Sequence, residues 1–153
     1  MDSTDRKILN LLQTDASLTV KQIAQQIALS GTPGWKRIQT LEQNGFIRAS
    51  VALLAPKKVN ASVTVFMAIK TDQHTSDWIE RFNREESQLP EVMEIYRMSG
   101  EIDYLLRVVV SSIEAHDAFY KKLIDRIELA NVTSSFAMEQ IKYTTALPVS
   151  MDV

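Results

Sequence analysis

A chain of 153 residues with 45% hydrophobic and 24% charged side chains has the composition of a globular protein, and it is long enough for one ordinary domain or two small ones. It contains no cysteine, which excludes disulfides, thiolate nucleophiles and Cys-based zinc sites, and only two histidines, so we expect no metal and no other cofactor. Because no apolar run approaches the roughly 18 residues that span a bilayer and the N-terminus lacks the pattern of a signal peptide, we expect a cytoplasmic protein with no membrane partner.

The net charge of −2 is unevenly distributed along the chain. Residues 1–58 hold eight Lys and Arg against four Asp and Glu, a net charge of +4, whereas residues 59–153 carry −6. Such an asymmetry indicates two modules with different partners, of which the basic one is suited to phosphates. A chance imbalance of solvated charges would give the same count, so charge alone does not identify a DNA-binding module.

Two short helices are predicted at the start of the chain. The spacing of apolar residues predicts the first over 4–14, with Thr4 or Asp5 as its cap. A second amphipathic segment over about 19–28 begins at Thr19, whose hydroxyl is a favourable helix cap.

A third helix is predicted from the pair Thr32-Pro33 to Gln43. Threonine supplies a capping oxygen, proline is tolerated in the first turn, and Asn44-Gly45 is a typical helix end. We expect Trp35 to face the core with the apolar stripe of this helix, which leaves a polar and basic side exposed.

Three helices in fewer than 46 residues, with a short turn between the second and third, are typical of a helix-turn-helix. The third would enter the major groove of double-stranded DNA, with Lys36, Arg37 and Gln39 at base edges and the hydroxyls of the first turn at phosphates. The predicted DNA-binding residues are Ser30, Thr32, Lys36, Arg37, Gln39 and Thr40.

The rest of the chain alternates between strand and helix patterns. Residues 47–60 are predicted as an extended linker or strand that separates a domain over 1–46 from a second domain over 61–153. Within the second domain, strands are predicted at 61–71, 92–98, 104–110 and 132–143, and helices at 75–88 and 112–127.

The order βαββαβ predicts an α+β, ferredoxin-like domain in which both helices cover one face of an antiparallel sheet. The strand over 104–110 is apolar on both faces, so we expect the bare face to pack against a second subunit in a homodimer.

Three classes of function are compatible with this arrangement. One is a DNA-binding regulator, the second is a ferredoxin-like amino-acid sensor whose N-terminal helices bind a protein, and the third is a small dimeric enzyme. The sequence lacks a Ser/His/Asp signature and a phosphate-binding glycine loop, which argues against the enzyme.

Three segments resemble the Lrp/AsnC family of transcriptional regulators, and the likeness covers nearly the whole chain. These segments are residues 5–9 (DRKIL), residues 29–47 (LSGTPGWKRIQTLEQNGFI) and residues 99–106 (SGEIDYLL). Residues 132–145 (VTSSFAMEQIKYTT) and Trp35-Lys36-Arg37 are most similar to the DecR-type branch of the family, which is associated with cysteine and sulfur amino-acid metabolism.

The resemblance implies a winged-helix-like DNA-binding domain, an effector domain, and dimers that assemble further, often to octamers, with amino acids bound between dimers. Gly100 allows close backbone N–H groups to meet a carboxylate, and Asp103 or Glu101 would hold an ammonium group. The effector residues implied are Met98, Ser99, Gly100, Glu101, Asp103, Tyr104 and, from a neighbouring subunit, Thr133, Ser134 and Ser135.

Overall fold

The computed structural model describes residues 1–28 and 31–149, and it divides the chain into two compact units. The N-terminal unit comprises residues 1–53 together with the C-terminal segment that begins at Ile141. The sheet unit comprises residues 54–140. The prediction assigned this last segment to the second domain, whereas in the structure it groups with the N-terminal unit.

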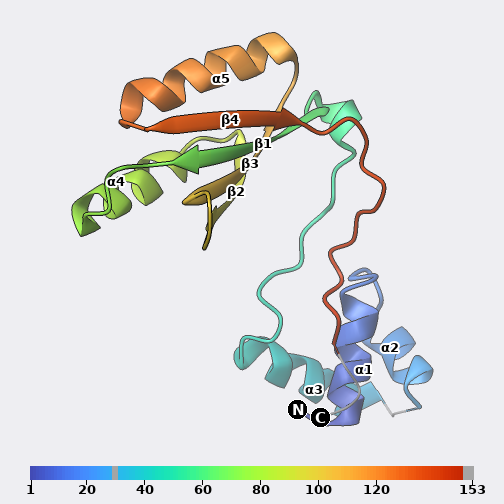
Figure 1. The fold of residues 1–153 in the computed structure, drawn as a ribbon. Helices are drawn as coiled ribbons and strands as arrows, with labels where there is room; N and C mark the ends of the chain where they lie inside the picture. Colours follow the sequence, from blue (N-terminus) through green and yellow to red (C-terminus); the bar gives the residue numbers. More distant parts are fainter. Residues whose placement is uncertain (29–30, 150–153) are drawn as a thin grey trace. The chain divides into compact units, whose positions relative to one another are not determined.

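The N-terminal unit contains three helices, α1 (Ser3–Leu12), α2 (Val20–Gln26) and α3 (Gly31–Gln43), as Figure 1 shows. One side chain from each helix forms the buried centre of the unit, and these are Ile8, Ile23 and Leu41. Burial of these apolar side chains stabilises the association of helices that would be too short to persist alone.

The caps of these helices agree only in part with the predictions. Asp2, not Thr4 or Asp5, caps α1, because its side chain accepts from the Asp5 backbone N–H while the Asp5 side chain accepts from that of Asp2. Thr19 caps α2 as predicted. Thr32 lies inside α3 and is therefore not its cap.

The C-terminal segment is joined to the end of α1 by hydrogen bonds between the Gln13 side chain and the Leu147 backbone. Gln13 follows α1, and its Nε2 donates to the Leu147 carbonyl at 2.8 Å while its Oε1 accepts from the Leu147 N–H at 2.9 Å. This pair of hydrogen bonds occupies both polar groups of the Leu147 peptide, much as a neighbouring strand would, and explains why the segment groups with the N-terminal unit.

Residues 47–55 have no regular secondary structure, and a short 3-10 helix, η1 (Pro56–Val59), follows them. The side chains of Val51, Leu53 and Leu54 are exposed. This part of the chain is therefore the extended linker rather than a strand of the sheet.

The sheet unit has the predicted order of elements: β1 (Val63–Lys70), α4 (Ser76–Glu86), β2 (Val92–Arg97), β3 (Tyr104–Val110), α5 (Ile113–Arg126) and β4 (Asn131–Phe136). The strands are antiparallel in the order β2-β3-β1-β4 (Figure 1). The α+β, βαββαβ class is thus confirmed, although β4 ends at Phe136, well before the predicted residue 143.

One face of this sheet packs against both helices. Side chains at alternate positions of β1 and β3, such as Met67 and Leu106, join Phe82 of α4 and Phe119 of α5 in a single buried core. The opposite face carries the intervening side chains, including Phe66, which is 40% exposed, and the half-buried Leu105 and Val109. No helix in the described part of the chain is both long and apolar enough to cross a bilayer.

Candidate functional site

A glycine lies on the inward side of α3, where this helix faces α2. Gly34 is buried, and a Cβ built on it would lie 3.6 Å from the Ala24 Cβ and 4.0 Å from the Val20 Cγ1 of α2. Ile38 and Leu41 follow at helical spacing and pack in the core of the N-terminal unit. The buried stripe of α3 therefore passes through residues 34, 38 and 41.

The polar residues predicted to contact DNA lie off this stripe. Lys36 and Thr40 are exposed and Gln39 is half-buried. The Thr40 hydroxyl donates to the Lys36 carbonyl at 2.9 Å, so it is partly occupied within the helix. Ser30 and the side chain of Thr32 lie outside the described part of the molecule.

Trp35 was predicted to be a core residue, and this prediction is wrong. Its side chain is 48% exposed. The reason is the neighbouring glycine: Gly34 takes the inward position, and a residue one place along a helix points about 100° away. Sequence periodicity favoured the larger apolar residue and did not predict that Gly34 would take the inward position instead.

Arg37 has two carboxylate partners that the sequence analysis missed. Its Nη1 donates to Asp2 Oδ2 and to Asp5 Oδ1, each at 2.7 Å. The hydrogen bonds that Arg37 donates to Asp5 and Asp2 raise the pKa of Arg37 above its usual value. The hydrogen bond from the Asp5 backbone N–H lowers the pKa of Asp2, and the hydrogen bond from Arg37 is the next largest cause of this lowering. We call this trio the Arg37 clamp, because it ties α3 to the N-terminus of α1.

The Arg37 clamp changes the predicted role of its arginine. A guanidinium with two short charge-assisted hydrogen bonds is fixed in position, and moving it to a base edge would break both bonds. The sequence analysis considered Asp5 only as a possible helix cap and assigned no role to Asp2, so it did not anticipate this pair of carboxylates.

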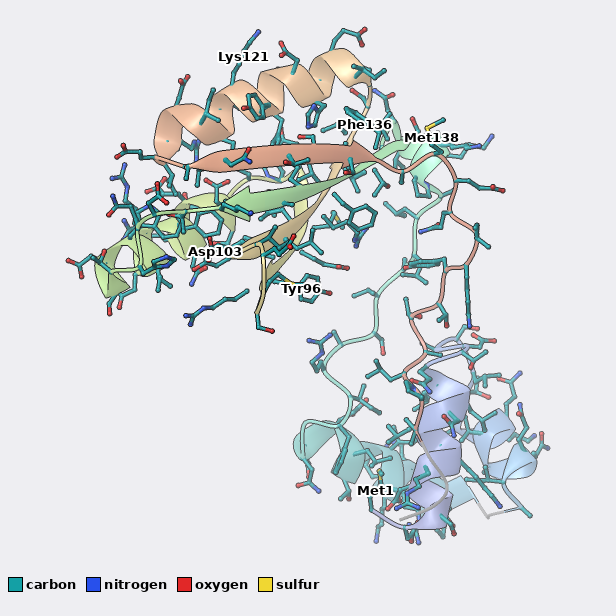
Figure 2. The ribbon with its side chains drawn as sticks, in the orientation of Figure 1. Met1, Tyr96, Asp103, Lys121, Phe136 and Met138 are labelled. Carbon is teal, nitrogen blue, oxygen red and sulfur yellow. The ribbon has the colours of Figure 1, made fainter. Side chains whose placement is uncertain are left out.

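Most of the predicted effector residues lie in or beside the turn between β2 and β3, near the labelled Asp103 and Tyr96 in Figure 2, whereas Thr133, Ser134 and Ser135 lie on β4. Gly100 has φ +124°, in the region that favours glycine, and an added Cβ would meet nothing within 4 Å. The turn, residues 98–103, is therefore open on this side. We call it the effector turn.

Asp103 fixes the base of the effector turn to β1. Its Oδ2 accepts from the Thr71 N–H at 2.8 Å, its own N–H donates to the Ile69 carbonyl at 2.9 Å, and its carbonyl accepts from the Met98 N–H at 2.8 Å. Asp103 is half-buried, whereas Met98, Ser99 and Glu101 are exposed. The exposed carboxylate of the turn is thus that of Glu101.

Two of the implied effector residues do not share the exposed surface. Tyr104 is only 4% exposed and packs on the helix-covered face, where the centroid of its ring lies 4.5 Å from that of Phe82. Ser134 pairs with the core residue Met67 and is half-buried, so it too lies on the covered face. Thr133 and Ser135 alternate with it, lie on the bare face and are exposed.

The effector turn and Thr133 lie at the same end of the sheet. Ile69 of β1 pairs with Tyr104 on one side and with Val132 of β4 on the other. Within one chain, β1 separates them. Among the described residues, there is no group of three or more His, Cys, Asp or Glu side chains placed to hold a metal ion.

The bare face of the sheet carries a polar group that the sequence analysis did not identify. Arg107 donates from Nη2 to Glu94 Oε1 at 2.7 Å, and the Tyr96 hydroxyl donates to Glu94 Oε2 at 3.0 Å. The hydrogen bond from Arg107 is the largest contribution that lowers the pKa of Glu94. The alternation of β2 and β3 places these side chains on the face with Leu105.

Two family models match the chain, one for each unit. Residues 1–48 match a winged helix-turn-helix DNA-binding model, and residues 64–147 match the Lrp/AsnC ligand binding domain. The first match contains all of α3, and the second contains the effector turn.

Relatives extend over almost the whole chain. The DNA-binding transcriptional activator DecR of Escherichia coli strain K12 is 47% identical over 150 residues, which are 97% of this chain and 99% of DecR. A crystal structure of an AsnC family transcriptional regulator from Agrobacterium tumefaciens is 57% identical with a TM-score of 0.95 and covers 97% of both chains. A transcriptional regulator from Neisseria meningitidis, solved in complex with L-Met, is 33% identical with a TM-score of 0.93 and also covers 97% of both chains.

Proposed function

This chain belongs to the Lrp/AsnC family of DNA-binding transcriptional regulators, and we propose that it binds a specific DNA sequence through α3 in response to a small sulfur-containing amino acid. The observation that carries the proposal is the presence of both halves of such a regulator, in order, over nearly the full length of its relatives. Because the proposed partner is DNA, we expect this protein to act in the cytoplasm.

The surface of α3 supports the DNA-binding half of the proposal. No residue from Gly31 to Leu41 is acidic, and Lys36 is exposed beside Thr40. A basic, hydrogen-bonding helix surface suits the major groove and its flanking phosphates. We propose that Lys36, Gln39 and Thr40 contact the DNA directly, with Ser30 and Thr32 at phosphates, and that Arg37 holds α3 in position.

The effector turn supports the amino-acid half. Gly100 leaves the backbone open to a ligand carboxylate, and the exposed Glu101 carboxylate suits its ammonium group. Met98, Ser99 and the exposed Thr133 and Ser135 would complete the site, the last two from a neighbouring subunit. Asp103 then acts by holding the turn on Thr71.

Two observations support a sulfur-containing amino acid as the effector. DecR is the relative with 47% identity, and the sequence resembles the branch that is associated with cysteine metabolism. The related regulator from Neisseria meningitidis was solved with L-Met. We propose cysteine or methionine as the effector of this chain.

The bare sheet face supports self-association. Phe66 at 40% exposure and Tyr96 at 52% exposure lie beside half-buried aliphatic residues of β3 on this face. Apolar surface of this kind is stabilised when a second copy covers it. We propose a homodimer through this face, and larger assemblies such as octamers that would bring one copy's Thr133 and Ser135 to another's effector turn.

A thermal scan of the whole protein against the twenty amino acids tests the effector. A ligand that binds only the folded state raises the Tm, so L-cysteine or L-methionine should raise it and the others should not. Glu101→Gln should abolish the rise, whereas Glu80→Gln, an exposed carboxylate on α4, should leave it unchanged. A rise that Glu101→Gln does not affect would contradict the proposed site, and no rise with any amino acid would contradict the effector proposal.

A further inference from the structure

The exposed indole of Trp35 is a large apolar group that the packing of the N-terminal unit does not bury. Gly34 fills the inward position against Ala24, and Ile38 and Leu41 supply the buried stripe. Trp35 remains 48% exposed on the flank of α3. The indole is therefore available to a partner of this helix.

The surroundings of Trp35 indicate what kind of partner it meets. Lys36 is its exposed neighbour, and the first eleven residues of α3 carry no acidic side chain. Arg37, the other neighbouring side chain that could contact a base, forms ion pairs with Asp2 and Asp5. A helix with this surface is attracted to a polyanion, and the side chains of its first two turns come within reach of base edges when it lies in the major groove.

Base edges in the major groove offer one apolar group, the C5-methyl of thymine. Indole has a single donor, Nε1–H, and no acceptor, so it cannot form the bidentate pairs by which Arg or Asn identify guanine or adenine. Its apolar ring surface is complementary to a methyl group. We propose that Trp35 recognises the methyl group of a thymine in the bound DNA site and thereby contributes to sequence preference. This inference rests on the function proposed above, in which α3 is the recognition helix.

The test replaces thymine by uracil, which removes the methyl group and leaves base pairing unchanged. The full-length protein would first select binding sites from a random duplex library, and each thymine of the selected site would then be replaced in turn. Burial of a methyl group is worth about 0.8 kcal/mol, so replacing the single thymine that Trp35 contacts should weaken binding by roughly four-fold. In Trp35→Ala the same replacement should have no effect.

Two matched variants complete the experiment. Lys36→Ala should weaken binding to all sites and retain the discrimination between thymine and uracil, and Trp35→Phe should retain part of it. Two results would overturn the assignment of Trp35 and leave DNA binding by α3 intact. One is that Trp35→Ala still discriminates between thymine and uracil, and the other is that the unsubstituted protein does not discriminate between them at any position. Failure to select any site from the library would instead overturn the proposed function, and this inference with it.

Discussion

At the scale of single residues, two side-chain arrangements determine how α3 is held. The Arg37 clamp joins it to the start of α1, and Gly34 faces α2 on its inward side. Neither arrangement uses the exposed side chains of Trp35, Lys36 and Thr40. The residues that position α3 can therefore be varied separately from those that we propose to contact DNA.

The Arg37 clamp predicts that Arg37→Ala weakens binding to all DNA sites by a similar factor, because the variant loses the position of α3 rather than a base contact. Asp5→Asn gives the sharper test. This substitution weakens the hold on Arg37 and also removes a negative charge from the DNA-binding unit. If Arg37 contacted the bases, its release from Asp5 would make the variant bind DNA more tightly. We expect Asp5→Asn to bind no more tightly than the unsubstituted protein. Tighter binding, with unchanged thermal stability, would show that Arg37 reads the DNA.

Gly34 predicts a stabilising substitution. An added Cβ would make an ordinary contact of 3.6 Å with Ala24, and alanine has the higher helix propensity, so Gly34→Ala should raise the free energy of unfolding by up to about 1 kcal/mol. Gly45 is the matched control, because its φ of +74° makes Gly45→Ala lower the same quantity by about 1 kcal/mol or more. Denaturant titration measures both. A destabilised Gly34→Ala would show that the helices cannot accept the methyl group.

At the scale of elements, local patterns predicted which helices and strands form, and their order, because each has the periodicity of one buried face. What they could not predict depends on contacts distant in sequence. The end of β4 follows from where β1 stops pairing, and the C-terminal segment groups with α1 through Gln13. The covered position of Tyr104 could have been predicted, since it alternates in step with the core residues Leu106 and Val108.

Helix α4 contains a buried acid that predicts a pH dependence. Glu86 is fully buried, and neither carboxylate oxygen has a hydrogen-bond partner among the described residues. Burial raises its pKa from 4.5 to about 7, against a partly opposing effect of Arg126. A carboxyl whose pKa is higher in the folded state contributes stability that is fully present below pH 4.5 and is lost as the pH rises through about 7.

Glu86→Gln removes this titration. The unsubstituted protein should lose free energy of unfolding on the order of 3 kcal/mol between pH 4.5 and pH 8 relative to Glu86→Gln, as measured by denaturant titration across that range. Glu80→Gln, at an exposed position of the same helix, should follow the unsubstituted protein. Parallel pH profiles for all three proteins would contradict the elevated pKa.

At the scale of the whole molecule, two chain segments link the unit that we propose binds DNA to the unit that we propose binds the amino acid. The linker over 47–55 connects α3 to β1, and the segment after β4 leads from the strand that bears Thr133 to the Leu147 contact with Gln13. The sequence predicted the two modules from their charge and their patterns. It did not predict that the C-terminal segment would group with the N-terminal unit, because that depends on contacts such as the one between the Gln13 side chain and the Leu147 backbone, 134 residues apart.

The central claim is that amino-acid binding and DNA binding are coupled in this chain. The direct measurement is the affinity of the full-length protein for its selected DNA site with and without L-cysteine or L-methionine, at fixed salt concentration. We predict that one of them changes the affinity by about 5- to 150-fold, and that DNA changes the affinity for that amino acid by the same factor. DNA affinity that is identical with and without every amino acid would contradict the account.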